Sequence, residues 1–196
     1  MIVPMAAEHV EEIARLHCAS LKGLLTVLGP RAARAYYRGG VRTSSAVGFV
    51  FLEDATVRGF VLGSAEPGAL KRDVLRANPL DIAFALGAGI IRRPTSLVWL
   101  VKSVRGPDEG SYDPHAAELT YLAVSAARRS GGIGRGLVEA FTRAMRERGV
   151  SSYELSVDED NGTAIGFYEK LGFCLVGRYR EFDVLHCRYR LDVTRD

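Results

Sequence analysis

The sequence predicts an α/β (α+β) fold in which helices pack against a β-sheet. The first observation is the order of elements after residue 117, where a strand, a helix, a strand, a helix and a closing hairpin follow one another. This order is typical of a sheet covered by helices. The second observation is size and composition. The chain has 196 residues, of which 47% are hydrophobic and 25% charged, and this is enough for one domain with a sizeable core.

Four elements are predicted in the first 65 residues. Apolar residues recur at helical spacing over Ala6–Val27, and the Gly-Pro pair at 29–30 ends that helix. A short helix over Arg31–Arg38 is closed by two glycines. The apolar run Ala46–Leu52 predicts a strand, and a Glu-Asp-Ala turn connects it to its hairpin partner, Val57–Ser64.

The middle of the chain is harder to interpret. Residues Ala69–Ala77 have a helical pattern that an Asn-Pro pair interrupts. Leu80–Ile91 is an apolar helix candidate, although two internal glycines lower its helix propensity. Thr95–Val104 is compatible with helix or strand, and Arg105–Pro114 is rich in loop-forming residues.

The pattern is clearest in the last third of the chain. Glu118–Ser125 is predicted to be a strand, and Ile133–Arg148 a helix with one apolar stripe, ended by a glycine. Ser152–Val157 is the next strand, and Asn161–Leu171 the next helix. Two final strands, 173–182 and 184–193, form a closing hairpin in which apolar residues alternate with His186, Arg188 and Arg190.

Composition excludes several classes of function. The net charge of +3 is too small to indicate nucleic-acid binding. The three cysteines lie far apart, without metal-ligand spacing or a disulfide pattern. The chain starts without a signal-peptide pattern, and its longest strongly apolar run, Ile82–Ile91, is too short to cross a bilayer. We therefore expect a soluble, cytoplasmic protein that binds neither nucleic acid nor membrane.

A glycine-rich turn between a strand and a helix indicates an anion site. Residues 129–134 read Arg-Ser-Gly-Gly-Ile-Gly, and backbone N–H groups at such a helix start bind phosphate well. The P-loop pattern fails because no lysine follows the glycines, and the dinucleotide fingerprint fails because Glu139 stands where a glycine is required. A simple tight turn is the alternative.

A second motif, one strand later, narrows the interpretation. Residues 161–173 read Asn-Gly-Thr-Ala-Ile-Gly-Phe-Tyr-Glu-Lys-Leu-Gly-Phe. Together with Arg129-x-x-Gly-x-Gly, this stretch resembles the GNAT family of N-acetyltransferases at every motif position. The resemblance is strong over 118–173, plausible over 1–65 and absent over about 66–113.

The resemblance implies a mixed, mostly antiparallel central sheet with one splayed parallel strand pair, flanked by helices. This is the acyl-CoA N-acyltransferase fold, here as a single domain over 1–196. Residues 67–113 exceed what a minimal member needs, and long connections of this kind are usually functional or self-structured. We expect a helical insertion that covers the acceptor side, with a homodimer interface or extra core as the alternatives.

In this family, acetyl-CoA is the co-substrate. Its pyrophosphate is held by the glycine turn, its pantetheine arm lies between the splayed strands, and its thioester carbonyl meets a strand N–H. The capping asparagine of the later helix also contacts the arm. The residues implied to bind acetyl-CoA are Leu122, Ala123, Val124, Arg129, Ser130, Gly131, Gly132, Ile133, Gly134, Arg135, Asn161 and Tyr168.

The resemblance also implies two catalytic residues. Tyr168 is the expected general acid, which protonates the departing thiolate; a plain core aromatic is the alternative. Glu118 is the expected general base for the acceptor amine, in an apolar setting that raises its pKa; the alternative is a solvated carboxylate. The fallback bases are Tyr121, His115, Asp113 and Glu66. The four histidines share no ligand spacing, so no catalytic metal is expected.

The expected reaction is acetyl transfer to a primary amine, of a small molecule such as an amino sugar, an antibiotic or an amino-acid derivative. Acetylation of a protein N-terminus or lysine is the alternative within the same chemistry. A non-catalytic module that senses acetyl-CoA is the alternative from another class, and a longer acyl group is the alternative donor.

Overall fold

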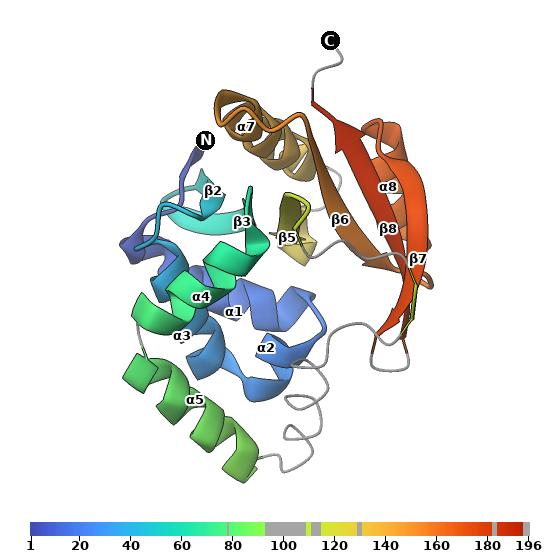
Figure 1. The fold of residues 1–196 in the computed structure, drawn as a ribbon. Coiled ribbons are helices and arrows are strands. Elements are labelled where there is room, and N and C mark those ends of the chain that lie inside the picture. Colours follow the sequence, from blue (N-terminus) through green and yellow to red (C-terminus); the bar gives the residue numbers. More distant parts are fainter. Residues whose placement is uncertain (78, 93–108, 111–114, 129–130, 182–183, 194–196) are drawn as a thin grey trace.

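The computed structural model of the chain describes residues 1–77, 79–92, 109–110, 115–128, 131–181 and 184–193 (Figure 1). Within these ranges eight strands form one sheet in the order β1-β2-β3-β5-β6-β8-β7-β4. The strands are β1 (Ile2–Pro4), β2 (Val47–Glu53), β3 (Thr56–Ser64), β4 (Glu109–Gly110), β5 (Glu118–Val124), β6 (Ser152–Asp158), β7 (Cys174–Glu181) and β8 (Val184–Asp192). Neighbouring strands are antiparallel except β5 and β6, which are parallel. The mixed, mostly antiparallel sheet predicted from the sequence is confirmed.

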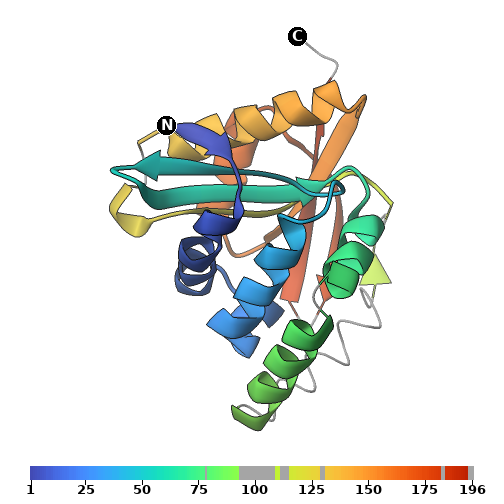
Figure 2. The same ribbon diagram turned by 90° about the vertical axis from the view of Figure 1, so that its left-hand side faces the viewer.

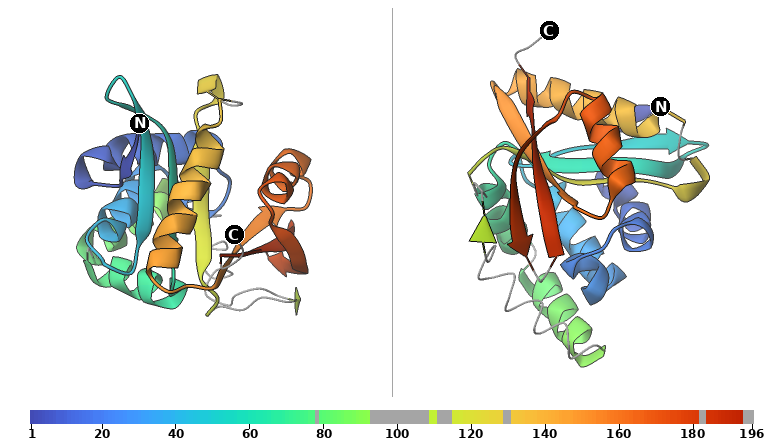
Figure 3. Two further views of the ribbon diagram at one scale, coloured as in Figure 1. Left: turned by 90° about the horizontal axis from the view of Figure 1, so that it is seen from above. Right: turned by 90° about the vertical axis from the view of Figure 1, so that its right-hand side faces the viewer.

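Helices lie on both faces of the sheet. They are α1 (Val10–Ser20), α2 (Leu24–Leu28), α3 (Pro30–Gly40), α4 (Pro67–Ala77), α5 (Pro79–Arg92), α7 (Ile133–Glu147) and α8 (Gly162–Lys170), with short 3-10 turns η1 (Ala7–His9) and η2 (Ala126–Arg128). Figure 2 shows α7 on one side of β2 and β3 and α1 and α3 on the other. The end of the sheet that contains β6, β8 and β7 carries α8 (Figure 3).

Two cores hold this arrangement together. The larger core lies between α7, α8 and the sheet, and the fully buried residues Leu137, Phe141 and Tyr153 belong to it. The second lies under α1 and α3, where Ile13 and Tyr37 pack against β2 and β3. The apolar stripe predicted for residues 133–148 is thus the face of α7 that enters the larger core.

Most predicted elements are present within one or two residues of their expected ends. One difference is in the first helix, which ends at Ser20 because Leu21 is extended (φ −115°, ψ 146°). The next helix, α2, then starts after Gly23, whose φ of 115° other residues rarely adopt. A second is β4, a two-residue strand inside the segment predicted to be a loop. Residues 67–77 and 79–92 are helical. The prediction for Thr95–Val104 lies outside the described residues.

The paired helices α4 and α5 lie on the side of the sheet that holds α1 to α3 (Figure 1). Leu86 of α5 packs against a small apolar cluster formed by α2 and α3. Arg38 of α3 also forms an ion pair with Asp81 of α5, at 3.1 Å between Nη1 and Oδ2. The segment after β3 therefore extends the helical layer under α1 and α3.

Candidate active site

A cleft opens in the sheet where the two parallel strands separate. Among the described residues, β5 and β6 pair at Glu118 and Glu154 alone, and the N–H of Glu154 donates to the carbonyl of Ala117. Beyond this point the strands diverge and enclose a cavity of about 520 Å³. Its lining residues are Ser20, Leu21, Lys22, Leu119, Thr120, Tyr121, Leu122, Leu155, Ser156, Val157, Asp158, Asp160, Asn161, Ala164 and Tyr168.

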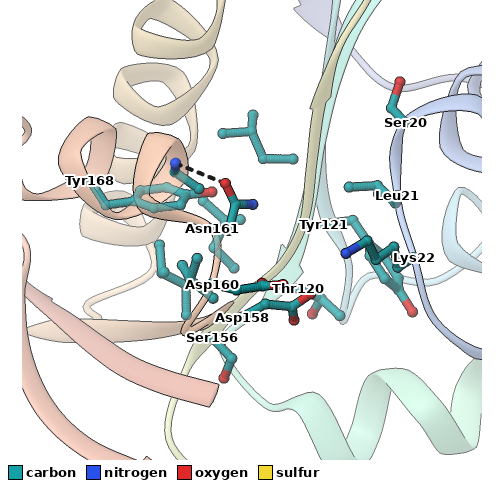
Figure 4. A pocket seen from close by; sticks show the side chains of 15 residues that line it. Ser20, Leu21, Lys22, Thr120, Tyr121, Ser156, Asp158, Asp160, Asn161 and Tyr168 are labelled. Carbon is teal, nitrogen blue, oxygen red and sulfur yellow. Dashed lines mark hydrogen bonds between the residues drawn. The ribbon is translucent and has the colours of Figure 1, made fainter. Parts of the chain in front are cut away.

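The lining side chains come from both faces of the sheet. Figure 4 shows Asn161 and Tyr168 on one side of β5, and Leu21, Lys22 and Tyr121 on the other. A molecule bound in the cleft can therefore be reached from the α8 side and from the α1 side. The end of α1 and the residues after it supply Ser20, Leu21 and Lys22 to the cavity. They were not predicted to belong to the site, because the helical pattern predicted over Ala6–Val27 carries no sign of a binding role.

The backbone of β5 leaves polar groups free toward the cleft. The N–H of Ser125 donates to the carbonyl of Arg58 in β3, and Ala123 opposes Phe60 two positions earlier in the same ladder. In an antiparallel ladder alternate residues direct their N–H and C=O to the partner strand. Ala123 therefore faces β3, whereas Leu122 and Val124 direct their N–H and C=O toward the cleft. This separates three residues that the sequence could not distinguish, and Ala123 is not placed to bind a ligand there.

A β-bulge interrupts the same strand. The pairing of β5 with β3 passes from Leu62–Tyr121 to Gly63–Leu119 and skips Thr120. A bulge bends the strand and changes which groups face each side. This bend lies at the height where β5 leaves β6, so it contributes to the opening of the cleft.

The glycine turn leads directly into α7. Gly132 precedes the helix with a φ of 74°, a left-handed conformation in which glycine is strongly favoured, and open space surrounds its α-carbon. The N–H groups of Ile133, Gly134 and Arg135 belong to the first turn, whose N–H groups have no partners within the helix. Gly131 is exposed beside them, whereas Arg129 and Ser130 lie outside the described residues.

Gly134 also lies against α8. A side chain there would start 3.2 Å from Cζ of Phe167 in α8, so glycine allows α7 and α8 to approach closely. The side chain of Arg128, just before the turn, is paired with Glu53, at 2.7 Å between Nε and Oε2. Arg135 is exposed at the start of the helix.

Asn161 and Tyr168 lie at the α8 wall of the cavity. The Oδ1 atom of Asn161 accepts a hydrogen bond from the N–H of Ala164 at 3.1 Å and caps α8. Its amide nitrogen is left to interact with a ligand. Burial raises the pKa of the Tyr168 phenol well above its ordinary value, so the hydroxyl carries its proton throughout the neutral range. A protonated phenol at a cavity wall can act as a general acid.

Glu118 is not in the apolar setting that was predicted for it. Its Oε1 atom accepts a hydrogen bond from Nη1 of Arg188 at 2.6 Å. Arg188 is only 1% exposed and also donates to Oε2 of Glu154 and to Oγ of Ser156. A second arginine, Arg190, donates from Nε to Oε1 of Glu154 at 2.9 Å. The start of the cleft is thus a buried network of opposite charges.

The other candidate bases are dispersed. Tyr121 lines the cavity, and burial raises the pKa of its phenol well above the ordinary value. Glu66 and His115 are exposed and do not line the cavity, and Asp113 lies outside the described residues.

A row of polar side chains follows the α1 side of β6 and β8. Leu155 and Val157 belong to the core with Tyr168, so the residues that alternate with them along β6 face away from α8. These are Glu154, Ser156 and Asp158, and their partners across β8 are Arg190, Arg188 and His186. The predicted alternation in the last strand contained this signal, because its charged residues share one face.

No group of three or more His, Cys, Asp or Glu side chains in the described part of the chain is arranged to hold a metal ion. No helix within the same ranges has both the length and the apolar character needed to cross a bilayer.

Comparison with known proteins adds a family match. The model of the acetyltransferase (GNAT) family matches residues 10–173. Mycothiol acetyltransferase of Streptosporangium roseum is 40% identical over 70 residues, which are 36% of this chain and 20% of that protein. An acetyltransferase of Pectobacterium atrosepticum is 36% identical over 80 residues, which are 39% of this chain and 57% of that protein. The matched segments therefore span only part of either relative.

Solved structures share the fold over nearly the whole chain. The crystal structure of SsHAT has a TM-score of 0.65 at 20% identity and covers 100% of this chain and 98% of that one. The ribosomal-protein-S18-alanine N-acetyltransferase of Escherichia coli has a TM-score of 0.57 at 15% identity and covers 100% of this chain and 95% of that one. At these identities the similarity concerns the fold alone.

Proposed function

Because the chain belongs to the acetyltransferase (GNAT) family, we propose that it transfers the acetyl group of acetyl-CoA to the primary amine of a small molecule. The observation that carries the proposal is the cleft between β5 and β6, which has a glycine turn beside it and side chains from both faces of the sheet around it. The co-substrate enters from the α7 and α8 side, and the acceptor enters from the α1 side.

The described residues fit the proposed co-substrate. At Gly132 the space is open, so a pyrophosphate can approach the backbone and the first-turn N–H groups of α7. Hydrogen bonds to such a charged group contribute about 1.5–3 kcal/mol each. The pantetheine arm then pairs with the cleft-facing N–H and C=O groups of Leu122 and Val124, as a peptide pairs with a sheet edge. Asn161 contributes its amide nitrogen to the arm.

The proposed chemistry is direct attack. The neutral amine nitrogen of the acceptor bonds to the thioester carbon, and a cleft-facing N–H of β5 stabilises the oxyanion. Collapse of the intermediate breaks the carbon–sulfur bond, and the phenol of Tyr168 donates its proton to the departing sulfur. The products are the N-acetyl amide and CoA thiol, and the surplus proton of the amine nitrogen passes through a base to the phenolate of Tyr168, which restores the acid.

Glu118 was the expected base, and it does lie at the start of the cleft. However, one of its oxygens is bound to Arg188. Neutralising Glu118 would remove one charge partner from a buried guanidinium, which is costly inside a protein. Glu118 therefore enters the proposal as a base candidate that must act from its second oxygen.

The acceptor side favours a small, cationic molecule. The charged residues that line the cavity are Lys22, Asp158 and Asp160, so the lining carries a net negative charge. The helices of 67–92 thicken the layer on this side. We propose that 67–113 is an insertion within one domain that narrows access, which suits a small amine better than a polypeptide. A cytoplasmic location suits acetyl-CoA as donor.

Release of CoA thiol from acetyl-CoA, measured over a panel of amino sugars, aminoglycosides, amino-acid amides and peptides, tests the proposal. Turnover of a small amine supports it. Preference for a peptide N-terminus or lysine would indicate the protein-acetylating alternative. Binding of acetyl-CoA without turnover of any amine would indicate a sensor. Faster turnover with long acyl-CoAs than with acetyl-CoA would show that the donor carries a longer acyl group.

A further inference from the structure

An acceptor amine that is protonated at neutral pH must lose a proton before it can attack, and the expected base is already engaged by Arg188. This inference rests on the proposed function. The described part of the acceptor side holds a second group suited to the task, which no motif indicated. It is the imidazole of His186 on β8, opposite Asp158 on β6.

We propose that His186, oriented by Asp158, is the general base for the acceptor amine. Its Nδ1 atom lies 3.2 Å from Oδ1 of Asp158, and Asp158 itself lines the cavity. The His186 side chain is 17% exposed; it is not itself a lining residue, and it adjoins the cavity through Asp158. Its ring stacks on Tyr179 of β7 with 5.0 Å between centroids and 22° between planes. Two neighbouring strands thus fix the ring.

The pairing also selects the tautomer. A carboxylate accepts but does not donate when ionised, so it favours the ring form with the proton on Nδ1. That form leaves a lone pair on Nε2. Within the part of the chain that the structure describes, Nε2 has no hydrogen-bond partner. A carboxylate on one nitrogen and a free lone pair on the other is the arrangement by which His acts as a base in many enzymes.

The step balances without another reagent. Nε2 takes one proton from the acceptor ammonium, and the ring becomes an imidazolium stabilised by Asp158. The neutral amine forms its bond to the acetyl carbon, the carbon–sulfur bond breaks, and Tyr168 protonates the sulfur. The amide nitrogen then loses its second proton. Two protons then remain to be placed, one from the amide nitrogen and one on the imidazolium. One of them restores the phenol of Tyr168, and the other leaves to solvent.

The described charged or titratable groups that face the His186 ring are Asp158 on β6, Tyr179 and Glu181 on β7, and Arg188 on β8. The positive charge of Arg188 is balanced by Glu118 and Glu154.

A matched pair of nucleophiles separates a base from a structural residue. Hydroxylamine is largely neutral at pH 7, whereas ethanolamine is an ammonium ion, and both are small. Wild-type protein, His186→Gln, Asp158→Asn and Glu118→Gln are compared for CoA release at pH 7 with each nucleophile. His9→Gln is the control, because His9 lies at the start of α1 and accepts only a local bond from Ala6.

We expect His186→Gln to lower kcat/KM with ethanolamine by about 10²-fold or more while turnover of hydroxylamine is largely kept. Asp158→Asn should follow the same pattern more weakly. Equal loss with both nucleophiles, or loss with ethanolamine in Glu118→Gln but not in His186→Gln, would overturn the proposal.

A second measurement does not depend on turnover. Long-range ¹⁵N–¹H NMR of histidine-labelled protein should show neutral His186 protonated at Nδ1, and Asp158→Asn should shift it toward the other tautomer. A proton on Nε2 in the wild-type protein would overturn the assignment. Failure of the wild-type protein to acetylate any amine would instead overturn the proposed function, and NMR would still decide the state of His186.

Discussion

Glu118 Oε1 and Arg188 Nη1 lie 2.6 Å apart at the point where β5 and β6 separate. Arg188 comes from β8 and also binds Glu154 of β6, so one buried guanidinium links the two strands that diverge above it. The network fixes where the cleft begins. It also joins the last strand of the chain to the expected base.

Replacement of Arg188 by methionine should therefore destabilise the fold. The change leaves Glu118 and Glu154 without their shared buried partner, and breaking a buried pair in this way costs about 3–5 kcal/mol. Glu118→Gln should cost less, because the amide oxygen can still accept from Arg188 and Glu154 keeps its charge. Urea denaturation at pH 7 measures both. Equal free energies of unfolding for the two variants would show that the network is not a structural link.

The glycine turn gives a prediction on binding. Gly132→Glu should abolish acetyl-CoA binding, because it places a carboxylate and a bulky chain where the pyrophosphate is proposed to lie. Gly132→Ala is the matched control. It carries only the strain of a left-handed alanine, about 1–2 kcal/mol, and its side chain meets no neighbour within 4 Å. Isothermal titration with acetyl-CoA compares them, and unchanged affinity in Gly132→Glu would remove the turn from the site.

Tyr168→Phe separates binding from catalysis. The buried phenol keeps its proton at neutral pH, so its loss should lower kcat by about 10²-fold and leave the affinity for acetyl-CoA little changed. The ring keeps its place between Phe167 and Phe173, so the variant should fold. Wild-type kcat in the variant would assign Tyr168 to the core instead.

His17 predicts how stability depends on pH. It is buried under α1 and α3, its Nδ1 lies 2.7 Å from the Tyr37 hydroxyl, and its Nε2 is buried without a partner among the described residues. Burial lowers the pKa of His17 from 6.5 to about 4. The unfolded chain therefore binds a proton that the native protein excludes. The neutral His17 therefore contributes to the free energy of unfolding in full above pH 6.5, and this stability is lost as the pH falls to about 4.

The lost stability should amount to about 3 kcal/mol at most. His17→Gln removes the titration while its amide can still bond to Tyr37. The difference between variant and wild type in urea unfolding should change across this pH window. A constant difference from pH 7 to pH 4 would contradict the assignment.

Gly63 tests the bulge in β5. A side chain there would collide with the backbone of Glu118 and Leu119 and with the ring of Phe141. Gly63→Ala should therefore destabilise the fold strongly and disturb the start of the cleft. Gly68→Ala, in α4 with nothing within 4 Å of the added carbon, is the control and should be harmless. Thermal unfolding of both variants decides whether the bulge geometry is correct.

The sequence predicted the fold well because its signals are local. Period-two and helical patterns mark β5, α7, β6 and α8, and two motifs on these elements point to one family. Local patterns could not predict which side chains meet across neighbouring strands of the sheet. Arg188 and His186 were visible only as members of an alternating strand, since nothing local shows that β8 lies beside β6 and brings them to Glu118 and Asp158.

The sequence also could not show which of Leu122, Ala123 and Val124 directs its backbone N–H toward the cleft. Which N–H faces the cleft depends on the ladder between β3 and β5 and on the bulge at Thr120, and neither leaves a mark in composition. The helix break after Ser20 was also missed, because the apolar spacing continues across it while Leu21 is extended.

The most direct test of the account is product stoichiometry with acetyl-CoA and a panel of small amines. Thiol release and N-acetylated product, the latter identified by mass spectrometry, are measured together for wild-type protein and for Gly132→Glu. We expect one acetylated amine for each CoA released by the wild-type protein, and neither product from the variant. Acetyl-CoA that binds the wild-type protein without forming either product across the panel would contradict the proposed function.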